Sequence, residues 1–105
     1  MTEYIVILVT AGSEDEAAGI AEAIVHAKLA GCVNIIRNIR SIYRWQGKIE
    51  DDSEVLMIVK TKRKFFQKIV TKVKELHKYS VPEIIALPVV EGSDNYLSWL
   101  SEVTG

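Results

Sequence analysis

Two stretches of this sequence, Tyr4–Val9 and Val55–Val59, are apolar at every position. A strand with one face in water alternates apolar and polar residues, whereas an unbroken apolar run is typical of a strand that is buried on both faces. The two stretches therefore predict two central strands of one sheet. The chain of 105 residues is long enough to bury a core around them, and we treat residues 1–105 as a single domain.

Between these two runs, the pattern predicts one helix and one long hairpin. Ser13 followed by Glu16 has the spacing of a capping box, and Gly31 is placed to end the helix that follows. The core positions expected for this helix are Ala17, Ile20, Ala21, Ile24 and Ala27. A second strand then runs from Cys32 to about Trp45, with a bulge expected near Asn38 and Ser41 and a turn at Gln46-Gly47.

After Val59, the pattern predicts a helix, a strand and a short last helix. The core positions expected for the second helix are Phe66, Ile69, Val70, Val73 and Leu76. Pro82 ends that helix region, because proline moves the preceding residue out of the α conformation, and Glu83–Val90 is the expected fourth strand. The last helix follows Gly92-Ser93-Asp94 and has Tyr96, Leu97, Leu100 and Val103 on its apolar side.

The resulting order, β-α-β-β-α-β with an added C-terminal helix, predicts a ferredoxin-like α+β sandwich with an antiparallel sheet. In that topology the first and third strands lie in the middle of the sheet, which agrees with their unbroken apolar runs. Two helices can cover only one face of a four-stranded sheet. We therefore expect another copy of the chain to cover the second face.

The composition excludes several classes of protein. A formal charge of −1 argues against a dedicated nucleic-acid binder, and no apolar run is long enough to span a membrane. The segment Met1–Tyr4 lacks the basic region of a signal peptide, and the single Cys32 rules out an internal disulfide. We expect a cytoplasmic protein in which Cys32 is a small buried hydrophobic residue.

Polar residues with possible chemistry concentrate at the junction between the second helix and the fourth strand. His77, Tyr79 and Glu83 flank the proline there, where functional groups are often carried by loops. A well-packed corner is the competing interpretation. The sequence has no metal-binding C-x-x-C, phosphate loop, nucleophile elbow or visible nucleophile–base pair, so we do not expect an enzyme.

Two large aromatic residues, Tyr43 and Trp45, lie near the end of the predicted hairpin. Because they are two positions apart, they project from the same face of the strand. Exposed aromatics at such a place indicate a packing interface more often than a catalytic group.

At these residues the sequence resembles the CutA divalent-cation tolerance family. The similarity covers essentially the whole chain, and its motifs are Ala30–Ile35, Ser41–Glu50, Glu54–Thr61, His77–Ile85 and Asp94–Trp99. The resemblance implies a fold similar to that of the PII signalling proteins and a homotrimer formed by strand pairing between subunits. It also implies a role in the response to divalent metal ions, with copper bound by some members.

The resemblance implies that copper-binding members of the family use a cysteine at the end of the first strand and adjacent histidines near the end of the second helix as ligands. The corresponding residues here are Val9 and the pair Leu76-His77, followed by Lys78 in place of the usual proline. We therefore expect at most weak copper binding, with His77 as the metal ligand. Soft and borderline ligands are too few for a strong site.

A second hypothesis is a PII-like cleft between subunits that binds a small anionic metabolite. Its expected residues are Tyr43, Trp45, Glu54, Lys60, Tyr79 and Glu83. In this hypothesis Lys60 supplies the positive charge, Tyr79 a hydrogen-bond donor and Trp45 an apolar wall. The alternative is that Lys60 pairs with Glu54 or Glu83 in a salt-bridged seal between subunits, because ion-pair networks resemble functional sites.

Overall fold

The computed structural model describes residues 3–105, and it has the predicted ferredoxin-like order of elements. Met1 and Thr2, part of the segment in which we expect no signal peptide, lie outside the described residues. The strands are β1 (Tyr4–Ala11), β2 (Cys32–Trp45), β3 (Lys48–Lys62) and β4 (Ile84–Pro88). The helices are α1 (Glu14–His26), α2 (Phe66–Leu76), preceded by a short 3₁₀ turn at Arg63–Phe65, and α3 (Asp94–Glu102).

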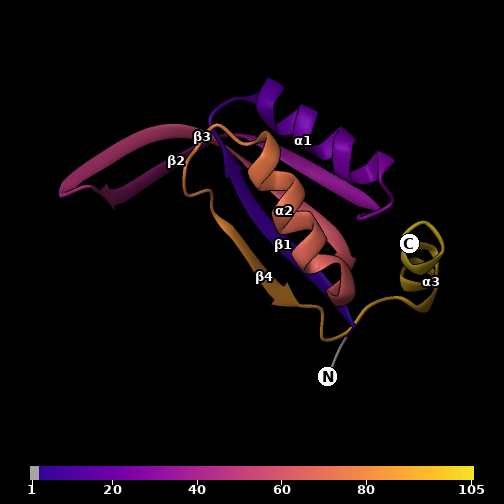
Figure 1. The fold of residues 1–105 in the computed structure, drawn as a ribbon. Helices are drawn as coiled ribbons and strands as arrows, with labels where there is room; N and C mark the ends of the chain where they lie inside the picture. Colours follow the sequence, from indigo (N-terminus) through magenta and orange to yellow (C-terminus); the bar gives the residue numbers. More distant parts are fainter. Residues whose placement is uncertain (1–2) are drawn as a thin grey trace.

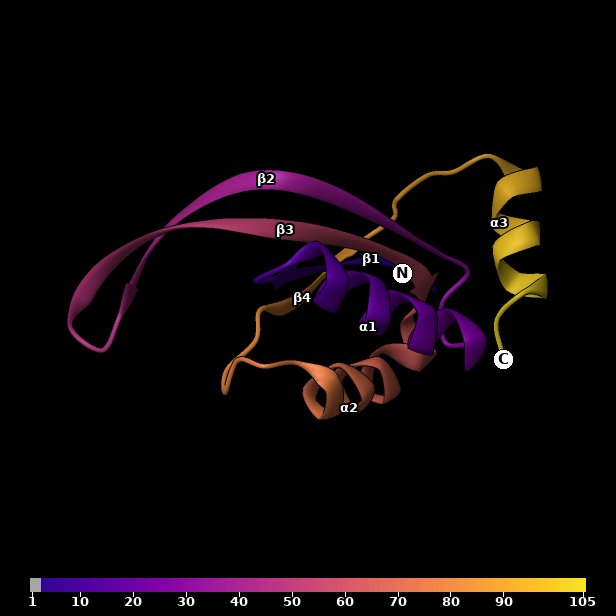
Figure 2. The ribbon, with the colours of Figure 1, turned by 90° about the horizontal axis from the view of Figure 1, so that it is seen from above.

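The four strands form one antiparallel sheet in the order β2-β3-β1-β4, so β1 and β3 are central as predicted. Helices α1 and α2 lie on one face of this sheet, and the hairpin of β2 and β3 extends well beyond them (Figures 1 and 2). Helix α3 stands at the end of the sheet that is opposite to the hairpin tip (Figure 2). The core lies between the sheet and the two helices, and its largest fully buried side chains include Ile7, Ile20, Ile24, Met57 and Ile69.

The face of the sheet away from α1 and α2, which we call the open face, is apolar but only partly covered within one chain. In β1, Ile5, Ile7 and Val9 are buried under the helices, whereas Val6 and Leu8 on the other side are half-buried. The strand register places seven apolar residues on the open face: Val6, Leu8, Ile36, Leu56, Ile58, Ile85 and Leu87. The helices of the same chain therefore bury one apolar face of the central strands and leave the other apolar face only partly covered.

The hairpin contains both irregularities that the sequence predicts. Ile36 pairs with Leu56, but the next paired residue of β2, Ile39, lies opposite Glu54, so β2 carries one extra residue at this bulge. Asn38, inside the bulge, has a positive φ of 58°. At the tip, Gln46 and Gly47 have φ values of 50° and 80°, as a type I′ turn requires at both central residues.

The end of the first helix differs from the prediction. Helix α1 ends at His26 rather than near Gly31, and Lys28 adopts the left-handed conformation with a φ of 61°. Ala27 is exposed rather than part of the core. Gly31 serves packing instead, because a Cβ atom there would lie 2.5 Å from Cδ1 of Leu100 in α3.

The second half of the chain shows smaller differences. Leu76 is exposed, whereas Phe65 and His77 are buried beside the predicted core positions Ile69 and Val73. The fourth strand spans Ile84–Pro88 and is shorter than the expected Glu83–Val90. Cys32 is half-buried rather than fully buried.

Candidate functional site

The junction after α2 is built around the buried imidazole of His77. Its backbone is extended and ends the helix, and its ring turns inward to the end of β1. The amide of Tyr79 donates a hydrogen bond of 3.0 Å to Nδ1 of His77. Because Nδ1 accepts this bond, the ring proton is on Nε2, which donates to the carbonyl oxygen of Thr10 at 2.7 Å. Both ring nitrogens are therefore occupied within the chain.

A second buried group, the carboxylate of Glu16, lies beside this imidazole. It accepts hydrogen bonds from the backbone amides of Gly12 at 3.2 Å and Lys78 at 2.7 Å, and its Oε2 is 3.5 Å from Nδ1 of His77. Ser13 caps α1 as predicted, through a 3.1 Å bond from the Glu16 amide to its hydroxyl. The sequence pattern indicates only a capping role for Glu16, because its contact with the junction joins segments that are distant in the chain.

Tyr79 connects the junction to β3. Its ring packs against that of His77 with centroids 4.7 Å apart, and its hydroxyl donates a 2.8 Å hydrogen bond to Oε2 of Glu54. Burial, together with this bond to a carboxylate, raises the pKa of Tyr79 above its ordinary value. A Cβ atom at Gly12 would lie 3.2 Å from the Tyr79 hydroxyl, so a small residue at position 12 leaves space for the tyrosine.

The hairpin places two aromatic side chains on the same side as Glu54. Glu54 pairs with Ile39, and counting by two along β2 from that position puts Tyr43 and Trp45 on the same face. The hydroxyl of Tyr43 donates a 2.6 Å hydrogen bond to Asp52, which raises the pKa of Tyr43 to about 12.

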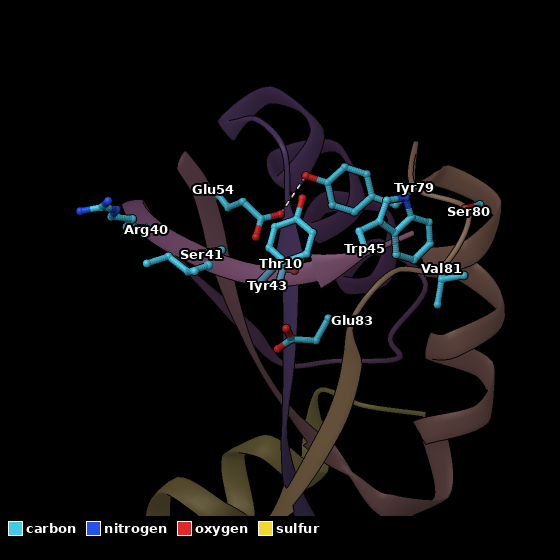
Figure 3. Close-up of a pocket in the computed structure, with 11 residues that line it drawn as sticks. Thr10, Arg40, Ser41, Tyr43, Trp45, Glu54, Tyr79, Ser80, Val81 and Glu83 are labelled. Atoms are coloured by element: carbon cyan, nitrogen blue, oxygen red, sulfur yellow. Dashed lines mark hydrogen bonds between the residues drawn. The ribbon is translucent and has the colours of Figure 1, made fainter. Parts of the chain in front are cut away.

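A cavity of about 710 Å³ lies between these elements. Its walls include Thr10 of β1, the hairpin residues Arg40, Ser41, Ile42, Tyr43 and Trp45, Glu54 of β3, and Tyr79, Ser80, Val81 and Glu83 of the loop before β4. Figure 3 shows Tyr43 and Trp45 of the hairpin close to the bond between Tyr79 and Glu54. The size is in the range typical of small-molecule sites.

Five of the six residues expected in a ligand cleft line this cavity, and the sixth, Lys60, does not. Lys60 pairs with Val6 and Cys32 near the opposite end of the sheet, six positions along β3 from Glu54. Among the described residues, it forms no ion pair with Glu54 or Glu83.

Arg40 is the basic residue among those lining the cavity, and it was not among the predicted site residues. Its guanidinium makes two hydrogen bonds to the carboxylate of Asp51, at 2.8 and 2.6 Å, which hold the pKa of Asp51 below its ordinary value. The register after the bulge places Arg40 on the face of β2 opposite to Ile39 and Glu54, and Figure 3 shows its side chain directed away from the Tyr79–Glu54 bond.

A preformed metal centre is not found in the part of the chain that the structure describes. Residues 3–105 contain no group of three or more His, Cys, Asp or Glu side chains arranged to hold a metal ion. His77 has Glu16 as its nearest carboxylate, and the two make a pair rather than a full coordination shell. The same residues contain no helix long and apolar enough to cross a membrane.

Comparison with known proteins agrees with the fold and the hairpin motifs. The CutA1 divalent ion tolerance protein family matches residues 5–103. The divalent-cation tolerance protein CutA of Thermus thermophilus is 52% identical over 100 residues, which cover 95% of this chain and 97% of that protein. Human protein CutA is 49% identical over 96 residues, but the match covers 91% of this chain and only 54% of the human protein.

Solved structures give the same result. The structure of the Thermus thermophilus protein superimposes with a TM-score of 0.94 at 51% identity, covering 97% of this chain and 99% of that one. CutA1 from Oryza sativa superimposes with a TM-score of 0.95 at 40% identity, covering 99% and 95%. The chain therefore belongs to the CutA1 divalent ion tolerance protein family.

Proposed function

We propose that this chain acts as a homotrimeric divalent-cation tolerance protein that binds copper, or another divalent cation, weakly. Its family supports the general role. The proposal for the metal rests on one observation, the 3.5 Å distance between Nδ1 of His77 and Oε2 of Glu16. An imidazole nitrogen and a carboxylate oxygen are both ligands that Cu²⁺ accepts in proteins.

Weak binding follows from the hydrogen bonds that these two groups already make. Nδ1 of His77 accepts the amide proton of Tyr79, and the Glu16 carboxylate accepts those of Gly12 and Lys78. A cation at this place would compete with those bonds and would have to enter between side chains that are nearly inaccessible to solvent. Two ligands with such competition support a low affinity.

Two apolar surfaces support self-association. The first is the open face of the sheet, where apolar residues of all four strands lie together. The second is on the hairpin, where Ile42 is 63% exposed and Ile49 is 60% exposed. Contiguous apolar surface of this kind is typical of a subunit interface, and a trimer formed by strand pairing would cover both.

The alternative, a PII-like site for an anionic metabolite, has less support. The positive charge it requires is expected from Lys60, which does not line the cavity within one chain, so this alternative depends on a second subunit that brings Lys60 to the cavity. The charge of Arg40 is already neutralised by Asp51. Relatives of the chain are named for ion tolerance and not for a reaction, which agrees with a non-enzymatic role. The cytoplasmic location stays a prediction, since relatives include a chloroplastic protein of Arabidopsis thaliana and one described as periplasmic from Archaeoglobus fulgidus.

Calorimetric titration with Cu²⁺ tests the metal site. We expect weak binding to the parent protein that decreases as the pH is lowered, because protons compete for the imidazole. His77→Gln and Glu16→Gln should lose this binding. His26→Gln is the matched control, because His26 is exposed at the end of α1 and has no place in the proposed site.

Each variant must first show the parent's circular dichroism and molar mass. Unchanged Cu²⁺ affinity in a folded His77→Gln protein would show that the imidazole is not the ligand. Loss of Cu²⁺ affinity in His26→Gln would likewise count against His77 as the ligand.

A further inference from the structure

The segment that carries α2 is strongly basic, although the chain as a whole is not. Residues 62–78 contain seven of the 13 lysines and arginines of the sequence but only one of its 14 acidic residues. The formal charge of the whole chain is −1, so the positive charge is concentrated in one segment rather than spread over the molecule. A surface of one sign on such a protein attracts groups of the opposite sign.

The helical period places these charges on the outer side of α2. Ile69 and Val73 are fully buried on the inner side, against the sheet. The outer side and its flanks carry four lysines, which we call the α2 basic face: Lys64, Lys68, Lys72 and Lys74. Three of these are exposed, and Lys72 is half-buried. The first three follow one another at intervals of four residues, so they form a row along the helix.

The charge of the α2 basic face is largely uncompensated. Lys72 forms an ion pair of 3.4 Å with Glu75, in which both side chains are exposed, and such pairs contribute little and exchange easily. Nζ of Lys64 lies 5.2 Å from the centroid of the Phe65 ring, a contact that leaves its charge in place. No acidic side chain of residues 3–105 forms an ion pair with Lys64, Lys68 or Lys74.

This face also stays accessible when subunits associate. Helices α1 and α2 lie on the side of the sheet opposite to the open face, and the hairpin extends beyond them (Figures 1 and 2). A second subunit that covers the open face and the hairpin therefore leaves the outer side of α2 in solvent. The proposed homotrimer would carry three copies of the α2 basic face.

The surroundings of the lysines favour a protein partner over a nucleic acid or a membrane. The exposed residues between the lysines are Gln67, Thr71 and Glu75, so the face lacks the aromatic rings on which bases stack and the apolar side chains that insert into lipid. The neighbouring helix α1 has three acidic residues in its first turn. These carboxylates would repel a polyanion or an anionic lipid surface broad enough to cover both helices, whereas a short acidic peptide segment can lie along α2 alone.

We propose that the α2 basic face docks an acidic segment of a partner protein, with its carboxylates on Lys64, Lys68 and Lys72. Lys68 and Lys72 are about 6 Å apart along the helix axis. Alternate residues of an extended chain are about 6.6 Å apart, so acidic residues at every second position match this row. The inference does not depend on the proposed metal binding, because none of its residues belongs to the His77–Glu16 pair.

Fluorescence anisotropy with labelled probes tests this assignment on the full chain in its native oligomeric state. The probes are a peptide of alternating glutamate and serine, the same peptide with glutamine for glutamate, and oligothymidylate. The acidic peptide should bind most tightly, and its affinity should fall as salt is added. Lys68→Gln should weaken its binding by about two- to fivefold, and the triple variant Lys64→Gln Lys68→Gln Lys72→Gln by about tenfold or more.

Lys48→Gln is the matched control, because it removes the same charge from an exposed position on the hairpin and should leave the binding unchanged. Every variant must first show the parent's circular dichroism and molar mass, and Lys68→Gln alone gives the answer if the triple variant does not. The proposal is overturned if the glutamine peptide binds as tightly as the acidic one, if no peptide binds at millimolar concentration in low salt, or if folded Lys68→Gln binds like the control. Tighter binding of oligothymidylate than of the acidic peptide, or sedimentation of the protein with phosphatidylserine vesicles, would also overturn it.

Discussion

The hydroxyl of Tyr79 donates a 2.8 Å hydrogen bond to Oε2 of Glu54, which joins the loop after α2 to β3. The amide of the same tyrosine donates to Nδ1 of His77, whose Nε2 donates to the carbonyl of Thr10. One side chain and its backbone thus connect three segments that are distant in sequence. The position of the cavity wall is consequently coupled to the packing of a buried imidazole.

Replacing Tyr79 with phenylalanine should destabilise the protein by on the order of 1 kcal/mol, because the buried carboxylate of Glu54 loses its donor. Urea denaturation at fixed protein concentration measures the change. Tyr43→Phe is the control, since it removes a similar hydroxyl–carboxylate bond at an exposed place and should cost less. If both substitutions lowered the free energy of unfolding equally, the burial of Glu54 would not be the reason for the cost of Tyr79→Phe.

Stability should decrease at strongly alkaline pH. The pKa values of Tyr43 and Tyr79 lie above the ordinary tyrosine value of 10.0, and that of Tyr43 is about 12. A pKa raised by folding means that the folded state holds its proton more tightly. The contribution is therefore complete below pH 10 and is lost as the pH rises through the folded pKa values. The free energy of unfolding should fall over that range, and less steeply in the Tyr43→Phe Tyr79→Phe double variant.

Two glycines should respond to alanine with opposite signs. Gly31→Ala places a Cβ atom 2.5 Å from Leu100 and 3.0 Å from Val103, so it should destabilise the docking of α3 by about 1–2 kcal/mol. Gly19→Ala meets no atom within 4 Å in the middle of α1 and should stabilise the protein by about 0.5–1 kcal/mol. Denaturation of both variants at one protein concentration tests the pair, and a stabilising Gly31→Ala would show that α3 does not pack as described.

A charge on the open face should prevent assembly. Leu8→Glu puts a carboxylate at the centre of that face, where its burial against another subunit would be costly. Light scattering should give a trimer for the parent, three times the chain mass of 11.8 kDa, and a smaller species for Leu8→Glu. Lys68→Glu on the exposed side of α2 should remain a trimer. A parent protein of monomer mass with native circular dichroism would refute the proposed assembly.

The fold could be predicted from sequence because its signals are local and agree with one another. The apolar runs of β1 and β3, the cap at Ser13 and the turn at Gln46-Gly47 each depend on neighbouring residues. The prediction was wrong where a distant contact decides the outcome. Gly31 looked like a helix end but is required by the approach of α3.

The candidate site shows the same division. Tyr43, Trp45 and Tyr79 were predicted to lie together because the hairpin of one subunit in a trimer can reach the helix–strand junction of the next, and within one chain they already line one cavity. Lys60 was assigned to the same cleft between two subunits because it ends the apolar run of the third strand, and within one chain it lies six positions along β3 from Glu54. The neutralisation of Arg40 by Asp51 depends on strand register, which residue types alone do not give.

The extra residue of β2 at Asn38 determines which chemistry the hairpin presents to Glu54. Side chains alternate along a strand, so one inserted residue exchanges the two faces of everything beyond it. Without the bulge, Arg40, Ile42 and Arg44 would occupy the face that now carries Tyr43 and Trp45. Deletion of one residue would thus replace this aromatic surface by a basic one while the rest of the chain stayed the same. A single evolutionary step could in this way reverse the charge of the groups that the hairpin attracts.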